Sequence, residues 1–370
     1  MESPEYVQTS LAAAITLGLA GGRFRRDARL TGLNLLLTYG DGCLGRCSYC
    51  GLSSGRELTA ADRRTFIRVR WPTCRLDEII ARTRTSLNGR SANGRLERVC
   101  VSMITHRRAF VDLNTVVARL HQELDLPISA LIAPTLLADP EGQLAETRAA
   151  GADMAGIALD AATPALFDRH RRDRVGGPHR WDHYWRAVEG AVAVFGRYQV
   201  GVHLIVGLGE TESEMIGTIQ AAHELGAHTH LFSFFPEAGT GVSDWPQPGY
   251  GQYRRVQLAR YIINHERGRV EAMGFNEAGQ VVDFGLDTED IVADGSAFMT
   301  SGCPGRGDRP GNPGRAACNR PFGNERPSKP IRNYPFPPGV EDIALIRFQL
   351  REGLGPERLR QSGRDLDDGH

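Results

Sequence analysis

Three cysteines with the spacing C-x3-C-x2-C stand on one short loop, Cys43–Cys50, directly after the apolar run 33–38. A loop this short can direct three thiolates at one object but cannot fold them into two disulfides. Three thiolates, here those of Cys43, Cys47 and Cys50, can hold a 4Fe–4S cluster and leave its fourth iron open to a ligand that is not protein. A zinc knuckle, the alternative, needs a fourth ligand nearby, and no His or Cys follows Cys50 until Cys74. The loop therefore favours an iron–sulfur cluster with one open iron.

Strand-like apolar runs alternate with helix-like stretches along most of the chain, which is the βαβα order of a parallel sheet or barrel. A capping box, Thr211–Glu214, opens a helix that is expected to end before Gly226. About six to eight βα units predict an α/β fold, a complete or partial TIM-type barrel with its chemistry at the C-terminal ends of the strands. The expected strands are 33–38, 98–104, 127–133, 154–159, 199–206, 229–235, 280–284 and 297–301, and the expected helices include 76–84, 113–124, 181–195 and 252–264.

The composition changes after residue 301, because nine of the 20 prolines lie in 303–338 and periodicity disappears there. We expect four regions: an N-terminal helical segment (1–30), the barrel (31–301), an irregular Gly/Pro-rich extension (302–338), and a C-terminal helix with a polar tail (339–370). The extension carries Cys303 and Cys318 in polar loops rather than in apolar strands. It is therefore a candidate site for a second cluster, with Ser301 or Cys100 as further ligands. Two free thiols in a loop are the alternative.

The balance of charge, the N-terminal sequence and the lengths of the apolar runs bear on which partners and which cell compartment to expect. Lys+Arg and Asp+Glu both number 44, so no basic field argues for nucleic acid or for an anionic membrane. The N-terminus lacks the basic flank of a signal peptide, and no apolar run is long enough to span a membrane. Iron ligands must remain reduced, so we expect a cytoplasmic protein.

A second motif, Ile205-Val206-Gly207-Leu208-Gly209-Glu210, closes the fifth expected strand. Glycines there let the backbone turn tightly and approach a ligand. Taken alone, the motif is an ordinary β–α turn. His228 and His230 fall on one face of the next strand at metal-ligand spacing, although polar residues that line a barrel interior have the same pattern.

The cysteine spacing, with Tyr49 before the last cysteine, resembles the signature of the radical S-adenosylmethionine (radical SAM) superfamily. The resemblance implies that the open iron binds SAM, that Tyr49 lies near the adenine, and that one electron from the cluster splits SAM into methionine and a 5′-deoxyadenosyl radical. The second motif resembles the I-x-G-x-x-E element that contacts the adenine, which implies contacts for Ile205, Gly207 and Glu210. His203 stands where the longer form of that element has Gly.

Three further SAM contacts follow from the resemblance by position. Ser102 ends the second strand, where the family has Gly-Gly-Glu. Asp160 ends the fourth strand and is similar to the "LD/LE" of biotin and lipoyl synthases. Arg180 lies where those families direct an Arg at the SAM carboxylate. The other arginines nearby, four of them in 169–174, are expected to be mostly solvated.

The chain is most similar to the biotin synthase-like branch, and within it to a subunit of the two-subunit lipoyl synthases. The stretches "SGCP…CNRPFGNERP…IRNYPFPP" and "NLLLTYGDGCLGRCSYCGLS" carry that resemblance. It implies sulfur insertion into a protein-bound octanoyl chain in lipoate biosynthesis, with the second cluster as sulfur source. The implied partners are a homologous radical SAM subunit, an octanoylated carrier protein and an electron donor.

Alternatives remain at this stage. A mutase or cofactor maturase of the same branch would use only the first cluster. An electron carrier would be reduced without cleaving SAM, and a zinc-binding interaction module would contain no iron. Cys100 resembles a cluster ligand of biotin synthase, but Gly201 occupies the position of another ligand in that enzyme. Cys100 and Cys74 are therefore expected to be small buried residues.

Overall fold

A single eight-stranded sheet, with the strand order β3-β1-β2-β4-β5-β6-β7-β8, forms the body of the protein. The computed structural model describes residues 1–26, 28–57, 65, 69, 71–88, 95–306, 316–323, 325–354 and 359. Six strands run parallel in chain order, and among the described residues the last of them, β8, does not pair with β2. The fold is therefore an open, partial TIM-type barrel. These strands are β2 (Gly32–Leu37), β4 (Arg98–Ser102), β5 (Ile128–Ile132), β6 (Met154–Asp160), β7 (Val200–Val206) and β8 (His228–Ser233).

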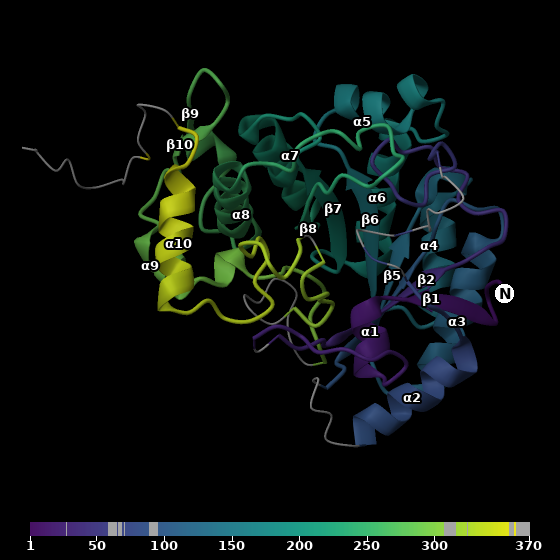
Figure 1. Ribbon diagram of the computed structural model, residues 1–370. Helices are drawn as coiled ribbons and strands as arrows, with labels where there is room; N and C mark the ends of the chain where they lie inside the picture. Colours follow the sequence, from purple (N-terminus) through teal and green to yellow (C-terminus); the bar gives the residue numbers. More distant parts are fainter. Residues whose placement is uncertain are drawn as a thin grey trace, which may run out of the picture.

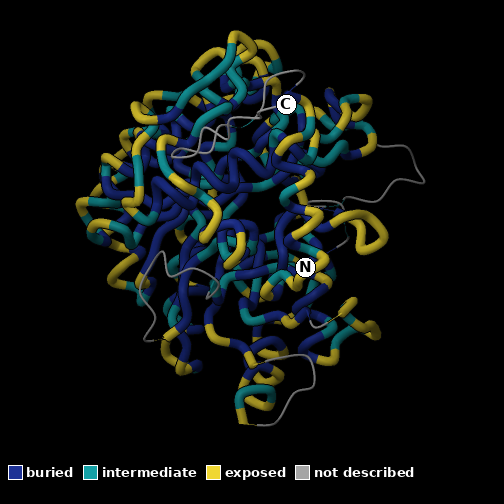
Figure 2. The backbone as a smooth tube through the Cα atoms, turned by 90° about the vertical axis from the view of Figure 1, so that its left-hand side faces the viewer, coloured by how far each residue is buried: buried dark blue, intermediate teal, exposed yellow. Residues whose placement is uncertain are grey.

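The two faces of the sheet differ in polarity. Along β7, Val202 and Leu204 are fully buried, whereas His203 and Ile205 between them are only half-buried. Alternate side chains of a strand point to opposite faces, so the first pair packs under the helices and the second pair faces the barrel interior. Figure 2 shows the buried strands inside a more exposed periphery, and Figure 1 shows the helices around the sheet. The helices are α2 (Leu76–Asn88), α3 (Ala109–Glu123), α4 (Pro140–Ala149), α5 (Pro164–Arg171), α6 (Trp181–Phe195), α7 (Glu212–Leu225) and α8 (Tyr250–Asn264).

The six expected parallel strands and the four expected helices are all present. The capping box of α7 is confirmed: Thr211 Oγ1 accepts from the backbone N–H of Glu214, and the Glu214 carboxylate accepts from the N–H of Thr211. Gly226 ends the helix with φ at +96°. Short 3₁₀ turns occur at Pro134–Leu136, Asp173–Val175, Val270–Ala272 and Ser296–Phe298.

The N-terminal segment is more than helical. Besides α1 (Leu11–Thr16), it contains β1 (Tyr6–Thr9), which pairs antiparallel with β2 and with β3 (Thr73–Arg75). Burial alternates along β1, with Val7 and Thr9 fully buried, which is typical of a strand with one face on the core. The segment therefore contains a helix, as expected, and also a strand that the prediction did not include.

Two expected barrel strands are also corrected. The segment 280–284 contains β10 (Val281–Asp283), but β10 pairs with β9 (Gly274–Phe275) in a separate two-stranded sheet. The segment 297–301 begins as a 3₁₀ turn and makes only an isolated bridge, Met299 to Tyr334. Apolar composition alone does not distinguish a core strand from a packed turn.

The irregular extension is held by buried arginines of α8. The Arg254 guanidinium is fully buried and donates to the backbone carbonyls of Ile331 and Arg332. After α9 (Glu289–Asp294) and the extension, α10 (Val340–Arg351) packs beside α8 (Figure 1). The expected helix is confirmed, and the tail after residue 354 lies outside the described residues apart from Leu359.

Candidate active site

The loop Cys43–Cys50, called the cluster loop, follows β2 at the C-terminal end of the parallel sheet. The N–H of Leu44 donates to the carbonyl of Thr105 beyond β4 at 2.8 Å, which fixes the loop to the neighbouring strand end. Cys43 and Cys47 both act electrostatically on Cys50, so the three thiols face one region. Burial raises the pKa of Cys47 and of Cys50, so cluster formation must release protons there.

Backbone and side-chain groups around these sulfurs suit thiolates. The N–H of Gly45 lies 3.3 Å from Cys43 Sγ, and the N–H of Leu52 lies 3.4 Å from Cys50 Sγ. Among the described residues, no three His, Cys, Asp or Glu side chains surround the position of a single metal ion. A cluster instead binds each cysteine through a different iron. The donor set therefore fits a 4Fe–4S cluster.

His179 and Arg171 complete the surroundings of Cys47, and the sequence analysis missed both. His179 Nε2 lies 3.4 Å from Cys47 Sγ, and its Nδ1 lies 2.6 Å from the Thr135 hydroxyl. Burial lowers the pKa of His179 to about 2, so its imidazole is neutral. Arg171 is 4% exposed, although its neighbours suggested a solvated run. The available signal was the position of His179 directly before the expected Arg180.

Tyr49 and Asp160, two of the predicted SAM contacts, lie side by side at the end of β6. Tyr49 Oη donates to Asp160 Oδ2 at 2.5 Å, and the guanidinium of Arg171 lies 3.4 Å from the same carboxylate. Asp160 has φ at +65°, next to an irregularity in the pairing of β6 with β7. This conformation is uncommon for a residue with a side chain. The end of β6 is thus shaped to hold an acid beside the cluster loop.

The glycine turn, Gly207–Glu210, lies next to the cluster loop. Gly207 has φ at +106°, and a Cβ there would lie 2.7 Å from a Pro248 carbon, so glycine is required. The Glu210 carboxylate accepts from the N–H groups of Gly207 and Leu208 at 2.7 and 2.9 Å. It therefore shapes the turn, and burial raises its pKa to about 7. Ile205 packs with Tyr49 and Leu208 in a small apolar cluster under the cluster loop.

His170 joins the two motifs. Its Nδ1 lies 2.7 Å from the Ser48 hydroxyl in the cluster loop, and its Nε2 donates to the carbonyl of Leu208 in the glycine turn at 2.9 Å. Burial lowers the pKa of His170, which favours the neutral tautomer with the proton on Nε2. The sequence carried no motif that marks this residue.

Two predicted SAM contacts lie elsewhere. Arg180 is the exposed N-cap residue of α6. Ser102 is the buried last residue of β4, and its hydroxyl interacts with the Cys100 thiol. Neither side chain has a described contact with the cluster loop, so both assignments stay predictions.

A second thiol set, Cys100, Cys303 and Cys318, gathers at the other end of the barrel interior. Hydrogen bonding between Cys100 and Cys318 lowers the pKa of Cys100 and raises that of Cys318. The carbonyl of Cys303 accepts from the N–H of Cys318 at 3.0 Å, and burial raises the pKa of the Cys303 thiol to about 11. Within the described part of the chain, Ser301 makes no hydrogen bond to these thiols. Of the two further ligands considered, only Cys100 joins them.

Arg98 braces the second thiol set. Its side chain is 2% exposed and donates to the carbonyl of Pro304 at 2.5 Å, to Ser129 at 2.9 Å, and to both carboxylate oxygens of Asp153. Because Pro304 follows Cys303, Arg98 connects the extension to β4 and β5.

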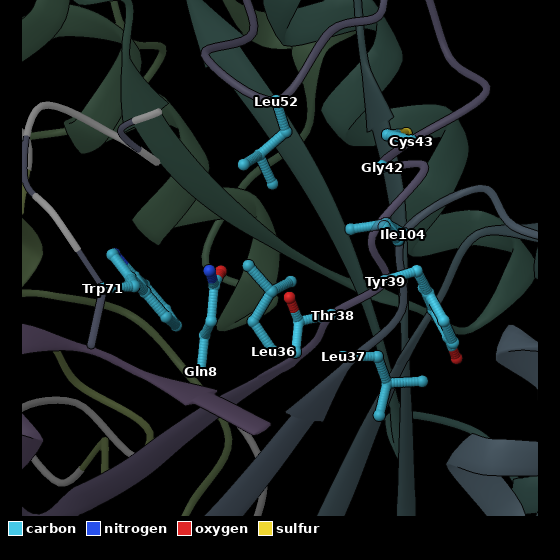
Figure 3. Close-up of a pocket in the computed structure, with 10 residues that line it drawn as sticks. All are labelled: Gln8, Leu36, Leu37, Thr38, Tyr39, Gly42, Cys43, Leu52, Trp71 and Ile104. Carbon is cyan, nitrogen blue, oxygen red and sulfur yellow. The ribbon is translucent and has the colours of Figure 1, made fainter. Parts of the chain in front are cut away.

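A small pocket of about 50 Å³ opens beside Cys43. Figure 3 shows Trp71 and Gln8 on one side, Ile104 on the other and Leu52 above. The lining mixes apolar side chains with the polar groups of Gln8 and Thr38. The remaining lining residues are Leu36, Leu37, Thr38, Tyr39 and Gly42.

Similarity to solved structures is low throughout. Methylornithine synthase (PylB) is 19% identical with a TM-score of 0.43, over 63% of this chain and 60% of that chain. HydG from Carboxydothermus hydrogenoformans, an [FeFe]-hydrogenase maturase, is 16% identical with a TM-score of 0.48, over 68% and 54%. The match thus spans less than two thirds of either relative. No curated protein sequence matches this chain.

The match to a protein family covers more of the functional region. The profile described as "Radical SAM superfamily" matches residues 37–222, half of the chain, from the end of β2 through most of α7. This range contains both the cluster loop and the glycine turn. None of the described helices has the length and apolar character needed to cross a bilayer. The chain belongs to the radical SAM superfamily and is a radical SAM enzyme, whose cofactors are a 4Fe–4S cluster and S-adenosylmethionine.

Proposed function

We propose that this enzyme inserts sulfur into a protein-bound octanoyl chain, as a subunit of a two-subunit lipoyl synthase. The observation that carries the proposal is the second thiol set, because an enzyme that only cleaves SAM and rearranges carbon needs no further ligands inside its barrel. The proposed ligands of a second cluster are Cys100, Cys303 and Cys318. The proposed partners are a homologous subunit, an octanoylated carrier protein and an electron donor.

The barrel interior supports an uncharged substrate. Among the described residues, the interior positions of β2 and β4 to β8 carry two charged side chains, Arg98 and Asp160, and both are paired. Two arginines from helices also reach this region, Arg171 and Arg260, and both donate to backbone carbonyls. An amino acid substrate carries an ammonium and a carboxylate, which are costly to bury without opposite charges. An acyl chain has no such requirement. The interior therefore favours a fatty acyl group over the amino acid substrate expected of a mutase.

The residues divide the work by position. The cluster loop would hold the first cluster, and the second thiol set would hold the other. When bound, the first cluster with SAM supplies a 5′-deoxyadenosyl radical, and a second cluster supplies sulfide. Around the first site, hydrogen bonds of Tyr49, Asp160 and His170 fix the positions of the neighbouring segments. Arg98 keeps the segment at Cys303 against β4. The barrel excludes water and positions one C–H bond of the substrate.

A mass measurement tests the proposal. The reduced enzyme is incubated with SAM and a peptide that carries an octanoyl-lysine, and 5′-deoxyadenosine and the peptide mass are followed. Wild type and a Cys74→Ala control should add sulfur to the peptide. Cys318→Ala should still cleave SAM but add none. If wild type cleaves SAM and leaves the peptide without sulfur, the proposal fails, and the single-cluster mutase or maturase becomes the better assignment.

A further inference from the structure

His203 and His230 lie side by side inside the barrel, outside both thiol sites. They pair in register on β7 and β8, and their ring centroids are 5.7 Å apart. A glycine makes room for His230, because a Cβ at Gly201 would lie 2.8 Å from His230 Nε2. At Gly156 a Cβ would be in ordinary contact with His203 Nε2, at 3.6 Å.

Strand register places the pair between the two thiol sites. Cys100 of β4 is paired with Ser129 of β5. Leu131, two residues after Ser129, is paired with Gly156 of β6, and Gly156 is paired with Gly201 of β7. His203 follows Gly201 by two residues, so it is four residues nearer the C-terminal ends than the level of Cys100, or about 13 Å along the strands. Ile205 and the glycine turn come next. Along the strands, His203 therefore lies between the level of Cys100 and the glycine turn.

The polar atoms of this pair lack partners in the protein. His230 is 8% exposed, and both of its ring nitrogens are buried without a hydrogen bond to any described residue. His203 is half-buried on the interior face and likewise makes no hydrogen bond within the described chain. A buried polar group without a partner costs about 1–3 kcal/mol. The nitrogens of His230 are sealed inside the protein, whereas His203 is partly exposed on the interior face and is the one of the pair that a ligand can reach.

The chemistry of the pair selects the ligand. Burial lowers the pKa of His203 to about 4 and that of His230 well below its usual value. The groups that face the pair include Phe232, which lies 5.1 Å from the His203 ring, and His228 and Arg260, which both lower the pKa of His230. Two neutral imidazoles do not attract a carboxylate or a phosphate. They suit an uncharged group that accepts or donates one hydrogen bond.

We propose that His203, backed by His230, hydrogen-bonds the amide that links the acyl chain to its carrier lysine. This inference rests on the proposed function, because it takes the acyl-lysine as substrate. His203 is then a substrate-binding residue that sets how deep the chain enters, and so which carbon lies near the radical.

The test compares two replacements of His203. Affinity for the octanoyl-lysine peptide is measured by calorimetry on the reconstituted enzyme with SAM bound. His203→Leu removes the hydrogen bond and should weaken binding about tenfold. His203→Gln keeps an uncharged hydrogen-bonding group and should stay close to wild type. His223→Gln is the matched control, because His223 is a buried histidine of α7, outside the barrel interior, that stacks on Tyr198.

Each outcome decides the inference. Loss of peptide affinity in His203→Leu alone, with unchanged SAM affinity in all variants, supports it. Equal affinity in wild type and His203→Leu overturns it and leaves the proposed function standing. If wild type itself does not bind the octanoyl peptide, the proposed function fails, and the assignment of His203 to its amide fails with it.

Discussion

The cluster loop and the second thiol set each gather three thiols, but the chain builds them in opposite ways. The first set comes from eight consecutive residues, and backbone N–H groups of the loop and of the residues directly after it, Gly45 and Leu52, support two of the sulfurs. The second set joins Cys100 of β4 to two cysteines more than two hundred residues later, and a buried arginine holds the parts together. Because its three thiols are close in sequence, the cluster loop can bind its cluster as soon as the end of β2 is folded. A dispersed set exists only when the whole barrel and its extension are folded.

This contrast predicts the largest effect for the cluster loop. Cys50→Ala should abolish 5′-deoxyadenosine formation, because one iron of the first cluster loses its ligand. Protein stability should hardly change, since the thiol is replaced by a smaller side chain in a loop. Chromatographic quantitation of 5′-deoxyadenosine measures the effect, with Cys74→Ala as control. Substantial SAM cleavage by Cys50→Ala would contradict the assignment of this loop.

The brace of the second thiol set should be structural. Arg98→Met leaves the Pro304 carbonyl and the Ser129 hydroxyl without their partner and should lower the free energy of unfolding by about 1–3 kcal/mol. Alkylation of Cys303 by iodoacetamide in metal-free protein should accelerate, because the extension separates from β4.

Arg254→Met provides the matched control for this brace. Arg254 is also fully buried and also binds backbone carbonyls of the extension, but far along the chain from Cys303. It should destabilise the protein without selective exposure of Cys303. Equal alkylation rates in the two variants would show that Arg98 does not hold the thiols.

The connection between the cluster loop and the glycine turn should matter for SAM. His170→Leu removes the hydrogen bonds to Ser48 and Leu208 and should raise the KM for SAM about tenfold. His183→Leu is the control, because His183 also donates to a carbonyl, that of Pro134, away from both motifs. An unchanged KM in His170→Leu would mean that the motifs are positioned independently.

The smallest effect concerns Glu210 and pH. Its pKa is raised from 4.5 to about 7 by burial, so the folded protein binds a proton there that the unfolded chain has lost above pH 4.5. Stability from this group is therefore complete below pH 4.5 and is lost as pH rises toward 7, by about 1 kcal/mol per unit. The difference in melting between wild type and Glu210→Gln should change over this range. A constant difference would show that Glu210 is already ionised.

Sequence patterns predicted the parts that depend on neighbours along the chain. The cluster loop, the glycine turn, the capping box of α7 and the six parallel strands all follow from local spacing and periodicity. Contacts between distant segments left no such signal. Arg171 looked like one of several solvated arginines, yet it is buried against Asp160.

The second thiol set lies between these cases. Its two late cysteines stood out because they occupy polar loops, whereas Cys100 looked like any small residue of a buried strand. Cys100 becomes a candidate cluster ligand rather than a packing residue only because the extension folds back against β4 and brings Cys303 and Cys318 next to it. Short strands such as β1 were missed for a related reason, since four residues carry too little periodicity to separate strand from helix.

The most direct test of the account is the iron and sulfide content of anaerobically reconstituted protein. Wild type is compared with a Cys43/Cys47/Cys50→Ala variant and a Cys100/Cys303/Cys318→Ala variant. Two independent clusters predict about eight irons in wild type and about four in each variant. If wild type and the Cys100/Cys303/Cys318→Ala variant both hold about four irons, the second thiol set binds no cluster and the proposed sulfur insertion is wrong.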